Sequence, residues 1–397
     1  MLLTDLTIDG GEVAAVLRDL VAIPSVNPAF PGGTGEAGVA AYVASYMRRN
    51  GVDVREQPVH PGRGNVLGML PAAKGGPTLL LEAHMDTVQT TGMSVDPFAG
   101  EVRDGRLYGR GACDTKASLA AMLVVAGTLG RSGAPLPCGV HLAAVIDEEY
   151  AYSGVSAIAE EIASGKLRYD AAVVGEPTSL HRVVAHKGCV RFHIEVQGAA
   201  GHSSEPAAGV NAIERMAEVI AYLRDEVEPG YEALRHPLVG PPTHCISEIA
   251  GGDAPNTIPD MCRITIDRRT VPGEEPLAVW AELRERLDRL RRASPGLALT
   301  VGSPFIVDYA MEAPLRAPIV RRLSQSTAKF AADRRNLGAA YGTDASKLAR
   351  VGVPTVVFGP GSIAQAHKPD EWVPLREVAA AASALLDLVV HYGEDEE

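Results

Sequence analysis

The chain has 397 residues, of which 46% are hydrophobic and 22% charged, so it is long and apolar enough for more than one buried core. Its 37 basic and 49 acidic residues give a formal net charge of −12, and no basic cluster stands out. This balance disfavours binding to the phosphate backbone of nucleic acids. The longest apolar runs, such as residues 119–126, are far shorter than a membrane span, so we expect no membrane partner.

The amino-terminal residues and the cysteines both bear on the cellular compartment. The first residues contain neither the basic segment nor the apolar segment of a secretory signal peptide. The five cysteines are scattered, odd in number and without a CxxC pair, as is typical of reduced thiols. Both features favour a cytoplasmic protein.

The predicted elements begin with helical periodicity over residues 9–49, interrupted by a loop rich in proline and glycine. Short apolar runs then alternate with helical stretches such as residues 116–129. Buried strands are predicted at residues 78–83, 140–146, 171–174 and 355–358. This alternation is typical of a mostly parallel α/β sheet with helices on both faces.

The pattern changes after Lys187. The predicted order there is a strand at 190–196, a helix at 209–225, strands at 244–249 and 261–267, a helix at 276–292 and a strand at 297–301. The order β-α-β-β-α-β is that of a ferredoxin-like sandwich. We therefore predict an α/β catalytic domain formed by residues 1–187 and 304–397, with a ferredoxin-like α+β domain of residues 188–303 inserted into it.

Acidic residues or histidines follow each of the four predicted strands of the larger domain, and one more acid precedes the helix at 116–129. They are His84, Asp86, Asp114, Asp147, Glu148, Glu149, Glu176 and His367. Open α/β sheets bind ligands beyond the carboxyl ends of their strands, so these side chains should converge. Several carboxylates at one point repel each other unless a cation neutralises them, and carboxylates with imidazoles suit zinc, or less specifically cobalt or manganese.

The segments that carry these residues also resemble a known family. They are HMD at residues 84–86, GRGACDTK around Asp114, DEE at 147–149, GEPTSL after residue 174 and GPGSIAQAHKPDEW around His367. They are similar to the group that contains acetylornithine deacetylase, succinyl-diaminopimelate desuccinylase, aminoacylase and glutamate carboxypeptidase. Within this group, the segments GEPTSLHRVVAHKG, GHSSEPAAGVNAIE, GGDAPN and GPGSIAQAHKPDEW most closely resemble acetylornithine deacetylase.

This resemblance implies a catalytic domain of the zinc-exopeptidase type that holds two Zn²⁺ ions, with Co²⁺ or Mn²⁺ as alternatives. Asp114 would bridge both ions, His84 and Glu176 would complete one site, and Glu149 and His367 would complete the other. A bridging carboxylate holds two ions about 3.5–4 Å apart, so both can act on one scissile carbonyl.

The resemblance also implies catalytic roles for Asp86 and Glu148. Asp86 would orient His84, and it lies two residues away on the same side of an extended segment. Glu148 would be the general base, because a turn after the strand can send Glu149 to a metal and leave Glu148 free to carry a proton. Relatives have a cis peptide bond after the bridging aspartate, so we expect the Asp114–Thr115 bond to be cis.

Further roles follow from the resemblance in the inserted domain. His202 is similar to a lid histidine that reaches the active site of the partner subunit and stabilises an oxyanion. Asn256 and Arg269 match lid positions that hold the substrate carboxylate, with Arg268 as a neighbouring alternative to Arg269. In the catalytic domain, Gly342 and Thr343 resemble a substrate-binding loop. We therefore expect a homodimer formed through residues 188–303.

The leading hypothesis for function is hydrolysis of the N-acyl amide of a small amino acid, with N-acetylornithine, and hence arginine biosynthesis, as the best single candidate. The alternatives are desuccinylation of N-succinyl-diaminopimelate and exopeptidase or carboxypeptidase activity on short peptides. Glu176 favours deacylation, because aminopeptidases and dipeptidases of the family usually carry Asp there. An inactive metal-binding relative is a remote hypothesis, and Glu148 with a complete set of ligands counts against it.

Overall fold

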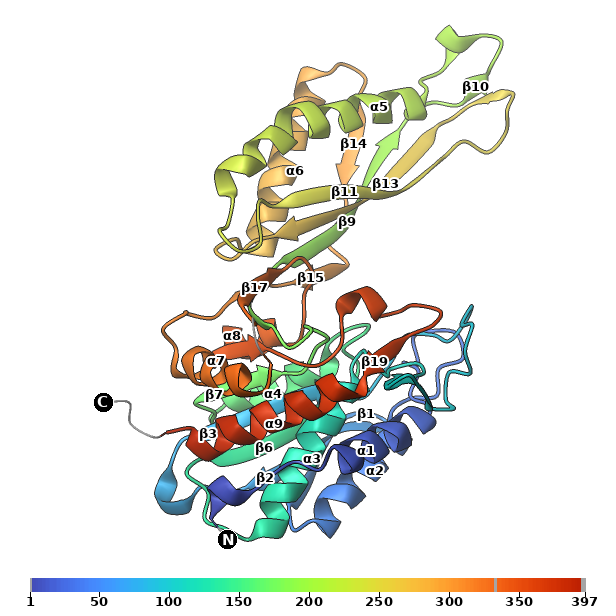
Figure 1. The fold of residues 1–397 in the computed structure, drawn as a ribbon. Coiled ribbons are helices and arrows are strands. Elements are labelled where there is room, and N and C mark those ends of the chain that lie inside the picture. The colour runs from blue at the N-terminus through green and yellow to red at the C-terminus, as the bar shows by residue number, and fades with distance from the viewer. Residues whose placement is uncertain (1, 332–333, 394–397) are drawn as a thin grey trace. The chain divides into compact units, whose positions relative to one another are not determined.

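The computed structural model describes residues 2–331 and 334–393, which divide into two compact units (Figure 1). The first unit consists of Met1–Val184, Ala313–Leu337 and Thr343–Glu397, and the second of Ala185–Glu312 and Gly338–Gly342. The second unit therefore extends beyond the predicted segment 188–303 at both ends and also includes Gly338–Gly342, which we predicted in the catalytic domain.

A large mixed sheet forms the centre of the first unit, in the order β1-β2-β6-β3-β7-β18-β8. Its strands are β1 (Asp53–His60), β2 (Arg63–Leu70), β3 (Thr78–His84), β6 (Gly139–Val145), β7 (Ala171–Val174), β18 (Thr355–Val357) and β8 (Arg182–His186). The four strands β6, β3, β7 and β18 are parallel, and the pairs on either side are antiparallel. The predicted α/β class is confirmed, with the parallel part at the centre of the sheet.

The parallel strands are buried because helices cover the sheet. Every residue of β7 and all but the first of β3 are buried, as expected for strands covered on both faces. The helices are α1 (Gly10–Ala22), α2 (Ala37–Arg49), α3 (Lys116–Ser132), α4 (Ser153–Ala163), α7 (Pro318–Phe330), α8 (Ala345–Arg350) and α9 (Leu375–His391). Helix α3 packs against β3 and β6, with α1 and α9 beside it (Figure 1).

Three short strands form a separate sheet in the first unit, in the order β19-β5-β4. They are β4 (Glu101–Arg103), β5 (Arg106–Tyr108) and β19 (Trp372–Pro374). This sheet joins the segment before Asp114 to the segment after His367, since Trp372 pairs with Tyr108. Within residues 2–331 and 334–393, we find no helix with the length and apolar composition that crossing a membrane requires.

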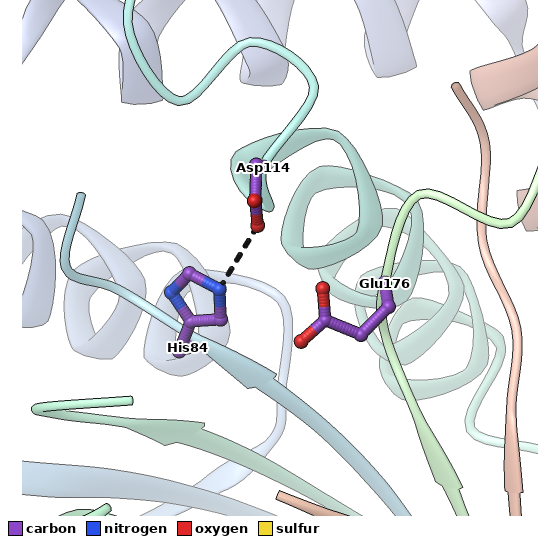
Figure 2. A group of neighbouring side chains, drawn as sticks. All are labelled: His84, Asp114 and Glu176. Atoms are coloured by element: carbon purple, nitrogen blue, oxygen red, sulfur yellow. Dashed lines mark hydrogen bonds and ion pairs between the residues drawn. The ribbon is translucent and has the colours of Figure 1, made fainter. Parts of the chain in front are cut away.

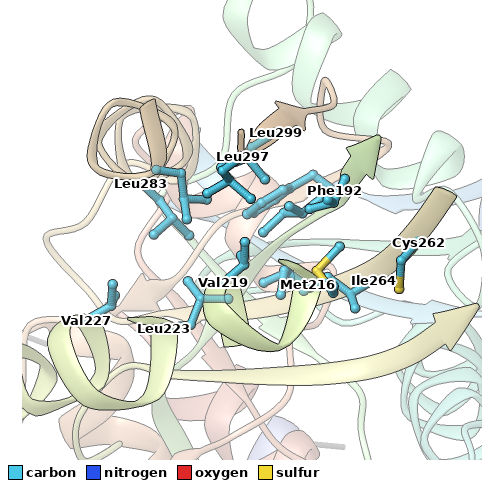
Figure 3. Close-up of a cluster of buried hydrophobic side chains, with 14 of the residues drawn as sticks. Phe192, Met216, Val219, Leu223, Val227, Cys262, Ile264, Leu283, Leu297 and Leu299 are labelled. Carbon is cyan, nitrogen blue, oxygen red and sulfur yellow. The ribbon is translucent and has the colours of Figure 1, made fainter. Parts of the chain in front are cut away.

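The second unit has the predicted β-α-β-β-α-β order. Its main elements are β9 (Gly188–Gln197), α5 (Ala212–Tyr222), β11 (Thr243–Gly251), β13 (Met261–Thr270), α6 (Pro276–Ala293) and β14 (Ala298–Val301). The strands pair in the antiparallel order β11-β13-β9-β14. Buried side chains of both helices and of β9, such as Phe192, Met216 and Leu283, form its core (Figure 3). This is a ferredoxin-like arrangement.

Helix α5 begins three residues later than the periodicity predicts. Asn211 is its N-cap, and its side chain accepts hydrogen bonds from the backbone amides of Ile213 and Glu214. Gly209 precedes this cap in extended conformation, and Val210 forms a bridge with Ala199. The N-cap therefore sets the first residue of the helix, and the spacing of apolar residues alone does not predict that position.

Candidate metal centre

The carboxyl ends of three parallel strands lie at the same edge of the sheet. His84, the last residue of β3, pairs with Val145, the last residue of β6. Two residues earlier, Glu82 pairs with Val174, the last residue of β7. The segments that follow these strands therefore begin side by side at one edge of the sheet, as expected for an α/β ligand site.

Two groups of potential metal ligands form at this edge, and they share Asp114. One group is His84, Asp114 and Glu176, all buried (Figure 2); the other is Asp114, Glu149 and His367. Within each group, one ligand atom of every residue lies within 4.8 Å of those of the other two.

Each carboxylate oxygen of Asp114 faces a different group. Oδ1 lies 3.2 Å from Nε2 of His84, and Oδ2 lies 3.4 Å from Nε2 of His367. Nε2 of His367 also lies 3.1 Å from Oε1 of Glu149. The structure thus brings together the five residues expected from the sequence to be ligands, with Asp114 shared by both groups.

The loop that carries Asp114 is fastened to neighbouring elements. The Asp114–Thr115 peptide bond is cis, as expected. The hydroxyl of Thr115 donates a hydrogen bond of 2.8 Å to the carbonyl of Gly175, the residue before Glu176. This contact links the segments that supply two members of the first group.

Asp86 is buried beside His84 and contacts it mainly through its backbone. Nδ1 of His84 lies 2.9 Å from the carbonyl oxygen of Asp86 and 3.5 Å from Oδ1. A proton held on Nδ1 leaves Nε2 free as a ligand atom. The Asp86 carboxylate also accepts hydrogen bonds from the backbone amides of Glu148 and Glu149, at 3.1 and 3.2 Å. Asp86 therefore orients the segment of Glu148 as well as His84.

The turn expected after β6 is present at Asp147, whose φ of 70° lies in the left-handed region. Asn27 supports this turn, since its Nδ2 donates to Asp86 at 2.7 Å and to Asp147 at 2.9 Å. Asn27 is fully buried. The sequence analysis did not identify Asn27 as a residue of the site, because the proline-rich loop around it indicates only a break between two helices.

The buried carboxylates and histidines of the site have shifted pKa values. Burial raises the pKa values of Glu148 and Glu176 well above that of an ordinary glutamate. Burial and the nearby negative charge of Asp114 also raise the pKa of Glu149. For Asp114, the hydrogen bonds with His367 and His84 outweigh burial and lower its pKa. The hydrogen bonds with Asp114 and Glu149 raise the pKa of His367 to about 10. Buried carboxylates with imidazole neighbours are a donor set that fits divalent zinc.

His202 and Asn256 lie close together in the second unit. His202, in β10 (Gly201–His202), pairs with Thr257 of β12 (Thr257–Ile258), and the amide of Ser203 donates to the carbonyl of Asn256. The side chain of His202 is exposed, and its Nδ1 accepts from the backbone amide of Ser204 at 3.2 Å. Nδ1 also lies 2.6 Å from the hydroxyl of Ser204, so both contacts hold the ring through Nδ1 and leave Nε2 without a contact to Ser204.

The two neighbouring arginines of β13 have different surroundings. Arg268 is buried, forms an ion pair of 2.6 Å with Glu274 and stacks on the ring of Tyr231. Arg269 forms an ion pair of 2.9 Å with Asp267, and its side chain is 29% exposed. The guanidinium group of Arg268 is thus buried and already paired, whereas the side chain of Arg269 is accessible to solvent.

Gly342 and Thr343 have clear local roles. A Cβ atom at position 342 would lie 2.1 Å from Oδ2 of Asp308, so any other residue there would have to displace the Asp308 carboxylate. Thr343 is buried, and its hydroxyl accepts from the amide of Ala345 at the start of α8. Substrate binding by these two residues stays a prediction.

The fold and the paired ligand groups define a metallo-hydrolase. Residues 80–391 match the family described as Peptidase family M20/M25/M40, and the chain belongs to this family. The expected family of metal-dependent hydrolases is thereby confirmed, while the closer likeness to acetylornithine deacetylase stays a prediction.

Solved structures share this fold at low sequence identity. Aminopeptidase PepT from Bacillus cereus ATCC 10987 is 22% identical, with a TM-score of 0.79 and coverage of 98% of this chain and 100% of that one. The M20 family metallo-carboxypeptidase Sso-CP2 from Sulfolobus solfataricus is 18% identical, with a TM-score of 0.75 and coverage of 96% and 99%. A dinuclear metal binding peptidase of the M20 family from Bacillus subtilis is 17% identical, with a TM-score of 0.72 and coverage of 96% and 97%.

Proposed function

We propose that the protein is a di-metal amide hydrolase that acts on small amino-acid derivatives. The observation that carries this proposal is the position of Asp114, whose two oxygens face two separate groups of ligands. His84, Asp114 and Glu176 would hold one ion, and Asp114, Glu149 and His367 the other. Two Zn²⁺ ions suit this donor set, with Co²⁺ or Mn²⁺ as alternatives, and they would supply Lewis-acid activation of the scissile carbonyl.

Glu148 is the proposed general base. Its backbone is held by Asp86, and burial raises its pKa well above that of an exposed glutamate. A carboxylate with a raised pKa can take a proton from the attacking water and return it to the leaving amine. Glu149 is held by the same aspartate but turned toward His367, so the two neighbours can have separate roles.

Exopeptidase activity on short peptides is the first candidate for the reaction. The similar solved structures named above are an aminopeptidase, a carboxypeptidase and a further peptidase, which supports this class of reaction. A shared fold alone does not determine the substrate, so the choice rests on assay.

Deacylation of an N-acyl amino acid is the second candidate, and Glu176 favours it. The family's aminopeptidases and dipeptidases usually carry Asp at this position, whereas this chain has Glu. N-acetylornithine is the best single substrate to test, followed by other N-acetyl amino acids and N-succinyl-diaminopimelate.

A substrate panel separates these candidates. The metal-loaded protein is assayed with dipeptides, tripeptides, N-acetylornithine, other N-acetyl amino acids and N-succinyl-diaminopimelate, each with Zn²⁺, Co²⁺ or Mn²⁺. Glu148→Gln serves as the control for contaminating hydrolases. Cleavage of peptides alone supports the exopeptidase, and cleavage of N-acyl substrates alone supports the deacylase. A protein that binds metal and cleaves none of these compounds contradicts the proposal and supports the inactive relative.

We further propose that the second unit binds substrate and forms a homodimer. His202 would donate a hydrogen bond to the developing oxyanion, and Asn256 and Arg269 would hold the substrate carboxylate. Strand β11 supports a dimer, because it is the exposed edge of its sheet and Ile249 on it is 59% exposed. The cysteines are all free thiols, which supports a cytoplasmic location.

A further inference from the structure

Glu371 binds the loop that carries Asp114. Its carboxylate is fully buried. Oε1 accepts hydrogen bonds from the backbone amides of Cys113 and Asp114, at 2.8 and 3.0 Å. Oε2 accepts from Nη1 of Arg110 at 2.6 Å and from the amide of Gly111 at 3.2 Å. Three backbone amides of one short segment thus point at a single carboxylate, in the manner of a loop that binds an anion.

Other hydrogen bonds also hold this loop: Nε of Arg110 donates to the carbonyl of Gln89 at 3.0 Å, and the thiol of Cys113 to the carbonyl of Ser362 at 3.4 Å. Thr115 and Lys116 hold its far end. The hydroxyl of Thr115 donates to the carbonyl of Gly175. The ammonium group of Lys116 donates to the carbonyls of Leu20 and Ile23, at 2.9 and 2.8 Å. None of these contacts involves the backbone amide of Asp114, which is bound by Glu371. Loss of the Glu371 carboxylate would therefore remove the hydrogen bond to the backbone amide of Asp114, while the Thr115 and Lys116 contacts keep the start of α3 in place.

We propose that Glu371 is a positioning residue of the metal centre, which holds the backbone of Asp114 so that each of its oxygens faces its own group of ligands. The proposal rests on the proposed function in one respect, the binding of two ions. It has a specific consequence, because Asp114 is the residue that both groups share. Displacement of Asp114 weakens both metal sites together, whereas loss of His367 or Glu176 weakens one of them.

The variant that tests this is Glu371→Gln. This variant keeps the length of the side chain but replaces one carboxylate oxygen with an NH₂ group, which donates. The two groups that donate to that oxygen therefore lose their acceptor, and Arg110 loses its negatively charged partner. Zn²⁺ affinity is measured by competition with a chromophoric chelator, and the two sites are followed by the visible spectrum of bound Co²⁺. We expect both binding steps to weaken about 10–100-fold, the range for residues that support metal ligands. Where the wild type turns over a substrate, excess metal should restore kcat with little change in KM.

Glu274→Gln is the matched control. Glu274 also accepts from an arginine, Arg268 at 2.6 Å, and from a backbone amide, that of Val271 at 2.9 Å, but it lies in the second unit. This variant should lower the Tm and leave the affinity for Zn²⁺ unchanged. Glu371→Asp is the second test if Glu371→Gln does not fold, because it keeps the charge but is one methylene too short to reach both pairs of donors.

The outcomes are distinct. Wild-type metal affinity in a folded Glu371 variant overturns the inference, even if its Tm is lower, and so does the loss of a single site. If the wild type binds two ions but cleaves none of the substrates, the proposed function fails while the inference about Glu371 is still decided by metal affinity. A wild type that binds no divalent ion overturns both.

Discussion

Nε2 of His84 lies 3.2 Å from Oδ1 of Asp114, although 30 positions separate the two residues in the sequence. The contact joins the end of β3 to the loop before α3, so it depends on the whole sheet and helix arrangement (Figure 2). Both atoms are of the kinds that bind divalent zinc. The arrangement around Asp114 leads to the predictions that follow.

We predict that the protein binds two divalent ions and that Asp114→Ala loses both, because Asp114 belongs to both groups of ligands. His367→Ala should retain about one ion, since His84 and Glu176 are unchanged. Elemental analysis after reconstitution with Zn²⁺ and gel filtration measures this. His244→Ala, in the second unit, is the control and should retain both ions. An Asp114→Ala variant that still holds two ions would exclude a shared ligand.

Replacement of Glu148 should separate metal binding from catalysis. Glu148 is in neither group of ligands, so Glu148→Gln should retain both ions. It should lose kcat by about 10²–10⁴, the usual contribution of general acid–base catalysis. Steady-state kinetics on the best substrate of the panel, together with metal analysis of the same sample, gives both numbers. Near-normal turnover would show that another group carries the proton.

Metal binding should release a proton from His367. In the metal-free protein, the hydrogen bonds with Asp114 and Glu149 raise the pKa of His367 to about 10, so its imidazole is protonated at neutral pH. A metal ion needs the neutral ring, so protons compete with it below that pKa and the apparent affinity rises as the pH is raised toward about 10.

Calorimetry in two buffers of different ionisation enthalpy measures this proton release. His367→Ala should release correspondingly fewer protons when Zn²⁺ fills the other group of ligands. An affinity that does not change between pH 7 and 9 would show that His367 is not protonated in the metal-free protein.

The proposed homodimer predicts complementation between two inactive variants. If His202 acts on the partner's metal centre, mixing His202→Ala with Glu148→Ala creates heterodimers with one complete site. Random exchange of a two-fold dimer then restores up to about a quarter of full activity. Exchange is verified with differently tagged chains, and each variant alone is the control. Mixtures that remain inactive after exchange, or a fully active monomer, would contradict a role of His202 across the dimer.

The sequence by itself determined much of the sheet and of the metal centre. Strand β7 lies at the predicted residues, and α3 begins at the predicted Lys116. These elements are local: an apolar run of a given period forms a buried strand or helix wherever the chain supplies covering surfaces. Most candidate ligands could be named for a related reason, since His84, Glu149 and Glu176 lie at or just after such strands and Asp114 lies just before such a helix. His367 lies farther from its strand, and its role as a ligand came from the resemblance to a known family.

The tertiary structure alone decided how these ligands are held. Glu371 binds the amide of Asp114, and Asp86 binds the amide of Glu148, across 257 and 62 positions of sequence. In both contacts a carboxylate pairs with a backbone amide, and every residue except proline offers such an amide, so no side-chain pattern marks the partner. Only the packing of strands and loops selects one amide among many, and that selection places both oxygens of Asp114.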